Sequence, residues 1–249
     1  MKLLLILPLF VLSLYASAQD VNSLVKEAVR LEDIPNEKAA LNKLKEVLKI
    51  QPAHVFALSK SSELSSRIGT RETSAASRDA WFKAALAYAQ RAIAASPQND
   101  QANVSMAMIL GKSTLTKSGK EKLKNARVIK KHLDIALKTN PNNYLAWHIL
   151  GRWNYEISNV SSVERAGAKI FYGGVPHGSL SNAIMYFEKS KSLQPLFILN
   201  YISLANAYHR DAQVDKAVAL LNTVQYLAAN TEDDVQHKAE ALRKIQEWK

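Results

Sequence analysis

Apolar residues recur at spacings of three and four positions along most of this chain, which is the pattern of helices that bury one face. Alanine and leucine supply many of these positions, and the 249 residues include only 8 glycines and 7 prolines. Helices are therefore interrupted rarely, because glycine and proline are the residues that most disfavour a helix interior. The pattern predicts an all-α fold.

The helical pattern also repeats, and one segment indicates the kind of repeat. Trp147, Leu150 and Gly151 fit the W-x2-L-G-x2-Y signature of tetratricopeptide repeats of about 34 residues, with Tyr155 one position late. The same frame recurs further along the chain, at Tyr201, Leu204, Ala205 and Tyr208. Prolines that would stop a second helix follow at regular places, at Pro52, Pro97, Pro141 and Pro195.

This frame predicts a tetratricopeptide-like helical-repeat solenoid of about five helix pairs plus a C-terminal capping helix, in a domain over residues 19–249. The repeats are expected near residues 21–54, 55–99, 100–143, 144–197 and 198–231, with the cap over residues 232–249. Gly151 and Ala205 would let paired helices approach closely, while Phe187 and Leu221 would fill the space between them. The buried face of the cap is expected to contain Val235, Ala239, Leu242 and Ile245.

Three stretches are longer than the repeat requires, near residues 68–77, 113–122 and 158–181. The third differs from the others because an apolar stripe runs through it before Gly173 and Gly174 end the pattern. The stripe consists of Val163, Ala166, Ile170 and Phe171. We expect a short amphipathic helix that packs across the groove of the solenoid or at its rim.

The amino terminus carries the features of a secretory signal peptide. Lys2 precedes an apolar run over residues 3–15, and Ala16-Ser17-Ala18 follows. The run is shorter than the roughly 20 residues that span a bilayer, which makes a retained anchor the weaker alternative. Removal of residues 1–18 by cleavage after Ala18 would make the protein periplasmic or secreted. The sequence contains no cysteine, so its stability rests on packing and not on disulfides.

Basic residues are concentrated in one part of the chain, whose formal net charge is +11. Residues 112–131 contain a single acidic residue, Glu121, against Lys112, Lys117, Lys120, Lys122, Lys124, Arg127, Lys130 and Lys131. Such a stretch is either a solvated helix face or a surface for an anionic membrane or an acidic protein. Nucleic acid is not expected as a partner of an exported protein.

Several segments resemble the regulator of microtubule dynamics family, over roughly residues 81–233. The resemblance rests on residues 126–142, residues 147–155 and residues 183–195, together with the insert that reads Arg165-x-x-Ala168-Lys169-Ile170-Phe171. It implies a helical adaptor domain with no known active site, associated in eukaryotes with microtubules and membrane contacts. The amino terminus departs from the family, so microtubule binding is not part of the expectation.

Helix-pair geometry assigns the groove to the second, fifth, ninth, twelfth and thirteenth positions of each first helix. In the last two repeats this predicts a polar partner-binding groove that contains His148, Arg152, Tyr155, Asn206, His209 and Arg210. Arg152 and Arg210 would clamp a carboxylate or phosphate, because a guanidinium offers a rigid fork of donors. The alternative is that Arg152 simply pairs with Glu156, four positions along the same helix.

The earlier repeats and the insert predict a more apolar part of the groove. Its lining is expected to contain Val104, Met108, Ile170 and Phe171. An extended peptide or an acyl chain would suit this lining. Lipid binding is therefore the alternative to peptide or protein binding.

No set of residues argues for catalysis, for a cofactor or for a metal. The six histidines are dispersed, and His148 with His209 would supply at most two ligands, one short of a catalytic zinc site. The sequence predicts a non-enzymatic module that binds a peptide or protein partner, with a lipid or apolar ligand as the alternative. It leaves the oligomeric state open.

Overall fold

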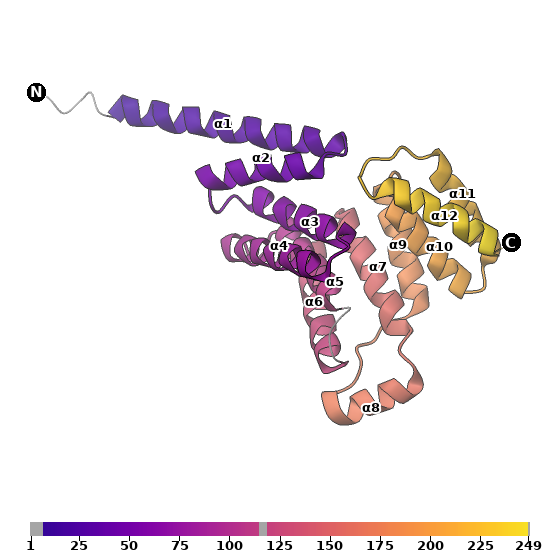
Figure 1. The fold of residues 1–249 in the computed structure, drawn as a ribbon. Coiled ribbons are helices and arrows are strands. Elements are labelled where there is room, and N and C mark those ends of the chain that lie inside the picture. The colour runs from indigo at the N-terminus through magenta and orange to yellow at the C-terminus, as the bar shows by residue number, and fades with distance from the viewer. Residues whose placement is uncertain (1–6, 115–118, 249) are drawn as a thin grey trace, which may run out of the picture. The chain divides into compact units, whose positions relative to one another are not determined.

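The computed structural model describes residues 7–114 and 119–248, and within them it contains twelve helices and no strand (Figure 1). The predicted all-α fold is confirmed. The chain divides after Ser96 into two compact units. The helices form five pairs, α1–α2, α3–α4, α5–α6, α7–α9 and α10–α11, and α12 follows as the cap.

The first unit is a run of four helices in which each packs on the next. They are α1 (Leu7–Asp33), α2 (Glu37–Ile50), α3 (Val55–Arg71) and α4 (Ala75–Ala95). Side chains fix three of the helix starts. Asn36 Oδ1, His54 Nδ1 and Ser74 Oγ accept hydrogen bonds from the backbone N–H groups three residues further on, at 3.3, 3.2 and 3.5 Å.

The second unit contains three helix pairs, an inserted helix and the cap. Its helices are α5 (Asp100–Thr114), α6 (Gly119–Thr139), α7 (Tyr144–Ser158), α8 (Ser162–Tyr172), α9 (Leu180–Leu193), α10 (Ile198–Arg210), α11 (Val214–Tyr226) and α12 (Asp234–Trp248). The first helices of the pairs are neighbours, because α7 contacts both α5 and α10. These three helices form the inner layer of the unit.

Close approach of α7 and α9 depends on Gly151, as the sequence predicts. A Cβ atom at this position would lie 2.6 Å from Cδ1 of Phe187, which is a clash. Phe187 is 1% exposed and fills the space that the missing side chain leaves. Ala205 and Leu221 are fully buried in the next pair, which confirms the same arrangement there.

The cap exists, but the prediction of its buried face is wrong for three of four residues. α12 packs on α10 and α11 through Ala241 and Ile245. Val235 and Leu242 are 71% and 48% exposed, and Ala239 is exposed as well. Two stripes of a short helix can look equally apolar, and the neighbouring helices decide which of them is buried.

The insert is helical, as predicted, and capping residues define both ends of the helix. Ser161 and Glu164 form a capping box at the start of α8, and Gly173 ends it in the left-handed region with φ of 73°. The expected packing of its apolar stripe is wrong. Val163, Ile170 and Phe171 are 80%, 76% and 73% exposed, and within α8 only Ala168 is buried. Figure 1 shows α8 apart from α7 and α9, to which two loops connect it.

The expected signal peptide falls partly outside the described residues, which begin at Leu7. From Leu7 to Asp33 the backbone is one continuous helix, α1, which passes through the expected cleavage point after Ala18. Among the helices that the structure describes, none is both long and apolar enough to span a membrane. Cleavage and export stay predictions. Residues 115–118 of the lysine-rich stretch also lie outside the described residues.

Candidate functional site

The fifth positions of the inner helices are buried, which corrects the predicted groove. His148 is 4% exposed, and its ring lies 5.6 Å from Phe187 and 4.9 Å from Phe197, measured between ring centroids. Burial lowers the pKa of His148 to about 3. This side chain therefore belongs to the core between repeats and offers nothing to a partner.

A hydrogen-bond relay fixes the tautomer of His148. Asn200 Nδ2 donates to the carbonyl oxygen of Phe187 at 2.9 Å, which leaves its Oδ1 as an acceptor. His148 Nδ1 lies 3.0 Å from that oxygen, so Nδ1 carries the proton and donates it. The relay thus connects three helices, α7, α9 and α10.

Arg152 is accessible, with a side chain that is 49% exposed. Its Nη2 atom lies 3.5 Å from Oε1 of Glu156, whose side chain is 59% exposed. The structure therefore contains the pair that the simpler alternative predicts. An exposed pair at this distance is weak, so Arg152 can exchange Glu156 for another carboxylate at little cost.

Arg210 joins α10 to the end of α7. Its Nη1 donates to the carbonyl oxygen of Tyr155 at 3.1 Å, its Nη2 donates to Ser158 Oγ, and its guanidinium lies 4.5 Å from the centre of the Tyr155 ring. A cation placed at the carbonyl end of a helix also compensates the partial negative charge there. Arg210 and Tyr155 are thus brought together, and two of the N–H donors of Arg210 bind groups of α7.

The remaining predicted polar residues lie on α10. His209 is exposed and stacks on Trp248 of the cap, with the ring centroids 4.1 Å apart and the planes 18° from parallel. Asn206 is half-buried. Together with Arg152, Tyr155 and Glu156 these residues form the accessible polar surface of α7 and α10, which we call the α7–α10 face.

The predicted apolar lining does not form one surface, which corrects that part of the site. Val104 is 4% exposed in a core cluster that includes Ala107 and Leu150, and Met108 is half-buried. Ile170 and Phe171 lie on the exposed side of α8. The repeat pattern predicts Val104 and Met108 in an open groove. In the structure, residues of α6 and α7 pack against α5 and cover much of this surface.

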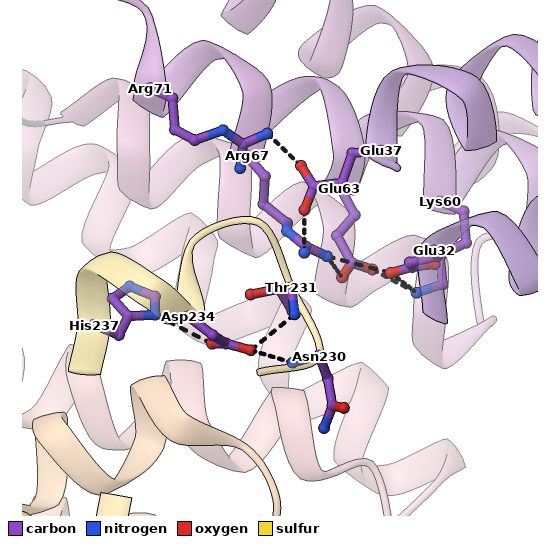
Figure 2. Close-up of polar contacts among 10 residues, drawn as sticks. All are labelled: Glu32, Glu37, Lys60, Glu63, Arg67, Arg71, Asn230, Thr231, Asp234 and His237. Carbon is purple, nitrogen blue, oxygen red and sulfur yellow. Dashed lines mark hydrogen bonds and ion pairs between the residues drawn. The ribbon is translucent and has the colours of Figure 1, made fainter. Parts of the chain in front are cut away.

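The first unit contains a buried cluster of charges that sequence reasoning missed (Figure 2). Glu37, the first residue of α2, has a fully buried side chain that accepts from Arg71 Nη2 at 2.5 Å and pairs with Arg67. Three further charged residues complete the cluster, Glu32, Lys60 and Glu63. A signal was available, because Glu63, Arg67 and Arg71 follow one another at spacings of four along α3.

Each carboxylate of this cluster has a cation as partner. Burial by itself would raise the pKa of Glu63, but Lys60 and Arg67 outweigh it and hold the pKa below its usual range. Beside apolar residues such as Leu58, Leu64 and Ile68, α3 also buries five small hydroxyl side chains, Ser59, Ser61, Ser62, Ser65 and Ser66. We interpret the cluster as structural. In the part of the chain that the structure describes, no three His, Asp or Glu residues are placed to hold a metal ion.

Solved structures with a similar arrangement of helices include a tetratricopeptide-repeat (TPR) protein. A thermophilic TPR protein of Thermus thermophilus has a TM-score of 0.63 and 16% sequence identity over 90% of this chain and 99% of its own. PilF of Pseudomonas aeruginosa has a TM-score of 0.54 and 12% identity over 94% of this chain and 88% of its own. At these identities the likeness concerns the fold alone, and it confirms the predicted tetratricopeptide-like solenoid.

Sequence comparison gives a more specific relationship. Regulator of microtubule dynamics protein 2 of Mus musculus is 27% identical over 161 residues, which cover 64% of this chain and 39% of the relative. Regulator of microtubule dynamics protein 1 of Bos taurus is 28% identical over 160 residues, 64% of this chain and 50% of the relative. This chain therefore spans half or less of these relatives. The model of the family "Regulator of microtubule dynamics protein 1-3" matches residues 24–249, and the chain belongs to this family.

Proposed function

We propose that this protein is a non-enzymatic interaction module that binds a peptide or protein partner on the α7–α10 face. The observation that carries the proposal is the accessibility of this face. Arg152, Glu156 and His209 are exposed, and Tyr155 and Asn206 are half-buried, whereas the fifth positions of the two helices, His148 and Ile202, are buried. Tetratricopeptide-like repeats favour such a role, because stacked inner helices present a continuous surface to a partner.

Arg152 is the residue that we expect to contribute most to recognition. Its present partner is an exposed carboxylate of its own helix at 3.5 Å, so a carboxylate of the partner can take that place. Tyr155 and Asn206 beside it add hydrogen-bonding groups. Arg210, in contrast, supports the face from behind, because it holds Tyr155 and the end of α7.

The names of the eukaryotic relatives do not decide the partner. This chain matches 39% and 50% of the two relatives described above, so activities of the whole relatives have no necessary counterpart here. The proposal concerns the class of partner, a peptide or protein segment that carries a carboxylate.

Substitution of Arg152 by glutamate tests the proposal. We expect Arg152→Glu to reduce recovery of the native partner at least about tenfold, because it places two like charges where the carboxylate would bind. The measurement is quantitative mass spectrometry of proteins cross-linked to the full chain in its native cell. Unchanged recovery with the variant would contradict the proposal.

The chain offers a closely matched control. Arg243 of α12 also has an exposed side chain and a glutamate four positions on, Glu247, at the same distance of 3.5 Å. Arg243→Glu therefore changes the same charge in the same kind of helix pair, but away from the α7–α10 face. Recovery of the partner should stay at the level of the unsubstituted protein.

A further inference from the structure

Helix α8 exposes its apolar side chains, whereas an ordinary surface helix buries them. Within α8 the one buried residue is Ala168. At about 100° per residue, Val163 and Ile170 lie on the opposite side of the helix, roughly 140–160° away from Ala168. They are 80% and 76% exposed, and Phe171 on the flank is 73% exposed. The apolar side of α8 therefore points to solvent.

Polar contacts hold α8 in this orientation. Arg165 donates from Nε to the carbonyl oxygen of Val160 at 3.2 Å and from Nη2 to that of Ile157 at 2.5 Å. At the other end, Arg127 Nη2 of α6 donates to the carbonyl oxygens of Tyr172 and Gly174 at 2.9 and 2.7 Å. Hydrogen bonds thus connect the start of α8 to α7 and its end to α6, while its apolar side is exposed.

Helix α6, whose Arg127 contacts the end of α8, carries a row of basic side chains. On α6, residues at spacings of four, three and four fall on one stripe of the helix, and all of them are exposed: Lys120, Lys124, Arg127 and Lys131. Arg127 belongs to this stripe and touches the end of α8. Lys122 of α6 is exposed as well. Lys169 contributes a further exposed cation on α8 itself.

We propose that α8 is a membrane-docking element that inserts Val163, Ile170 and Phe171 into the interface of an anionic lipid bilayer. The lysines of the α6 stripe and Lys169 would contact the phosphate headgroups around the inserted side chains. Apolar side chains with a rim of basic residues are the combination that binds anionic bilayer surfaces, where insertion and electrostatic attraction add together.

The size of the exposed patch favours a bilayer over a second protein. Three or four side chains of this size expose on the order of 400 Å². A stable protein–protein interface buries about 800 Å² on each partner, which is roughly twice as much. A bilayer needs no complementary shape, and its anionic headgroups match the positive charge of the basic stripe.

Co-sedimentation of the full chain with vesicles tests the proposal. We expect binding to vesicles of phosphatidylcholine mixed with phosphatidylglycerol, and weaker binding to phosphatidylcholine alone or at high salt. The double variant Ile170→Ser/Phe171→Ser should reduce binding to the mixed vesicles at least about tenfold. Circular dichroism should stay unchanged, because both side chains are largely exposed.

Matched double variants serve as controls. Val235→Ser/Leu242→Ser removes exposed apolar side chains from α12 and should leave vesicle binding unchanged. Lys120→Glu/Lys124→Glu should abolish the preference for phosphatidylglycerol. Lys45→Glu/Lys49→Glu makes the same change of charge at the same spacing on exposed positions of α2, and it should retain that preference.

Three results would overturn the proposal. The first is no binding of the unsubstituted protein to phosphatidylglycerol vesicles. The second is equal loss of binding in the α8 variant and the α12 control. The third is a change of molecular mass in light scattering for Ile170→Ser/Phe171→Ser, which would make α8 a contact between copies of this chain. Because Arg152→Glu alters neither α8 nor the lysine stripe, vesicle binding and partner binding can fail separately.

Discussion

Among the described residues, one carboxylate in each unit is almost completely buried, and the structure satisfies the two in different ways (Figure 2). Glu37 in the first unit is matched by the guanidinium groups of Arg67 and Arg71, which lie on another helix. Asp234 in the second unit is 4% exposed and accepts from the backbone N–H groups of Asn230 and Thr231 at 2.9 and 2.8 Å, with His237 Nδ1 at 3.4 Å.

The difference lies in what each carboxylate stabilises. Glu37 connects α2 to α3, so its ion pairs form only when two helices have packed together. Asp234 connects the loop before α12 to the start of the same helix, and its partners lie within four residues. Burial alone would raise the pKa of Asp234, but these hydrogen bonds outweigh it and lower the pKa. The first carboxylate is a tertiary contact, and the second is a local one.

The core of the second unit adds a third arrangement, a buried polar pair without charge. His148 and Asn200 bind each other between phenylalanine rings, and neither is ionised near neutral pH. Burying neutral groups that are hydrogen-bonded costs far less than burying ions. We therefore expect substitutions in the first unit to have the larger effects.

Removal of the Glu37 carboxylate should have the largest effect. Glu37→Ala leaves the half-buried guanidinium groups of Arg67 and Arg71 without the fully buried carboxylate that they share, and it should lower the free energy of unfolding by about 3 kcal/mol. Urea denaturation with hydrogen exchange at the amides of α2 and α3 measures this loss. Glu46→Ala, which removes an exposed carboxylate of α2, should cost less than about 1 kcal/mol.

Glu37 can also be removed together with both of its cations, which sharpens the comparison. Glu37→Leu/Arg67→Leu/Arg71→Leu should recover part of the stability that Glu37→Ala loses, because no ion partner of Glu37 stays behind and Glu32 and Glu63 keep Lys60. If Glu37→Ala cost no more than Glu46→Ala, the ion pairs of Glu37 would contribute nothing and the contrast between the units would disappear.

Acid should destabilise the second unit through His148. The pKa of this residue is about 3 in the folded protein and about 6.5 in the unfolded chain, so the unfolded chain binds the extra proton between these values. Its contribution to stability is complete above pH of about 6.5 and falls as the pH decreases towards the folded pKa. The loss between about pH 7.5 and pH 5 should be roughly 2 kcal/mol.

Unfolding of two variants over this pH range checks the assignment. His148→Gln should remove the corresponding part of the slope of stability against pH, even where the substitution lowers stability at every pH. His177→Gln changes an exposed histidine and should retain the full slope. A slope that is equal in both variants would mean that His148 becomes protonated within the folded protein.

The smallest of the three effects is expected at Asp234. Asp234→Asn keeps the shape and one acceptor oxygen but removes the charge that faces the two backbone N–H groups. We expect a loss of about 1 kcal/mol, with faster hydrogen exchange confined to α12 and the loop before it. Faster exchange throughout the second unit would show that this carboxylate also holds α10 and α11 together.

The sequence predicted the helix pairs well because their signals are local and repeated. In the sequence, Gly151 and Phe187 predict the close approach of α7 and α9. The structure shows it, because a Cβ atom added at Gly151 would lie only 2.6 Å from Cδ1 of Phe187. The candidate site was predicted less completely. Arg152 is accessible as expected, whereas His148 is buried, because the crossing of α7, α9 and α10 closes the space at the fifth position.

The roles of Arg152 and Arg210 also could not be predicted from their spacing in the sequence. Their positions in the repeat are similar, and sequence spacing offered both as a clamp for an anion. Only the packing of α10 against the end of α7 places Arg210 over Tyr155 and within reach of its carbonyl oxygen. Arg152 has no such neighbour and stays at the surface with Glu156.

By itself, the sequence determined the all-α class, the five helix pairs, the cap and the helical insert, because apolar periodicity and capping residues act over a few positions. The tertiary structure alone decided which stripe of a helix is buried. The apolar sides of α8 and α12 look equally suited to packing, yet Ile170 and Val235 are exposed while Ile245 is buried. Burial depends on which surface a neighbouring helix presents, and that surface comes from residues far away in the chain.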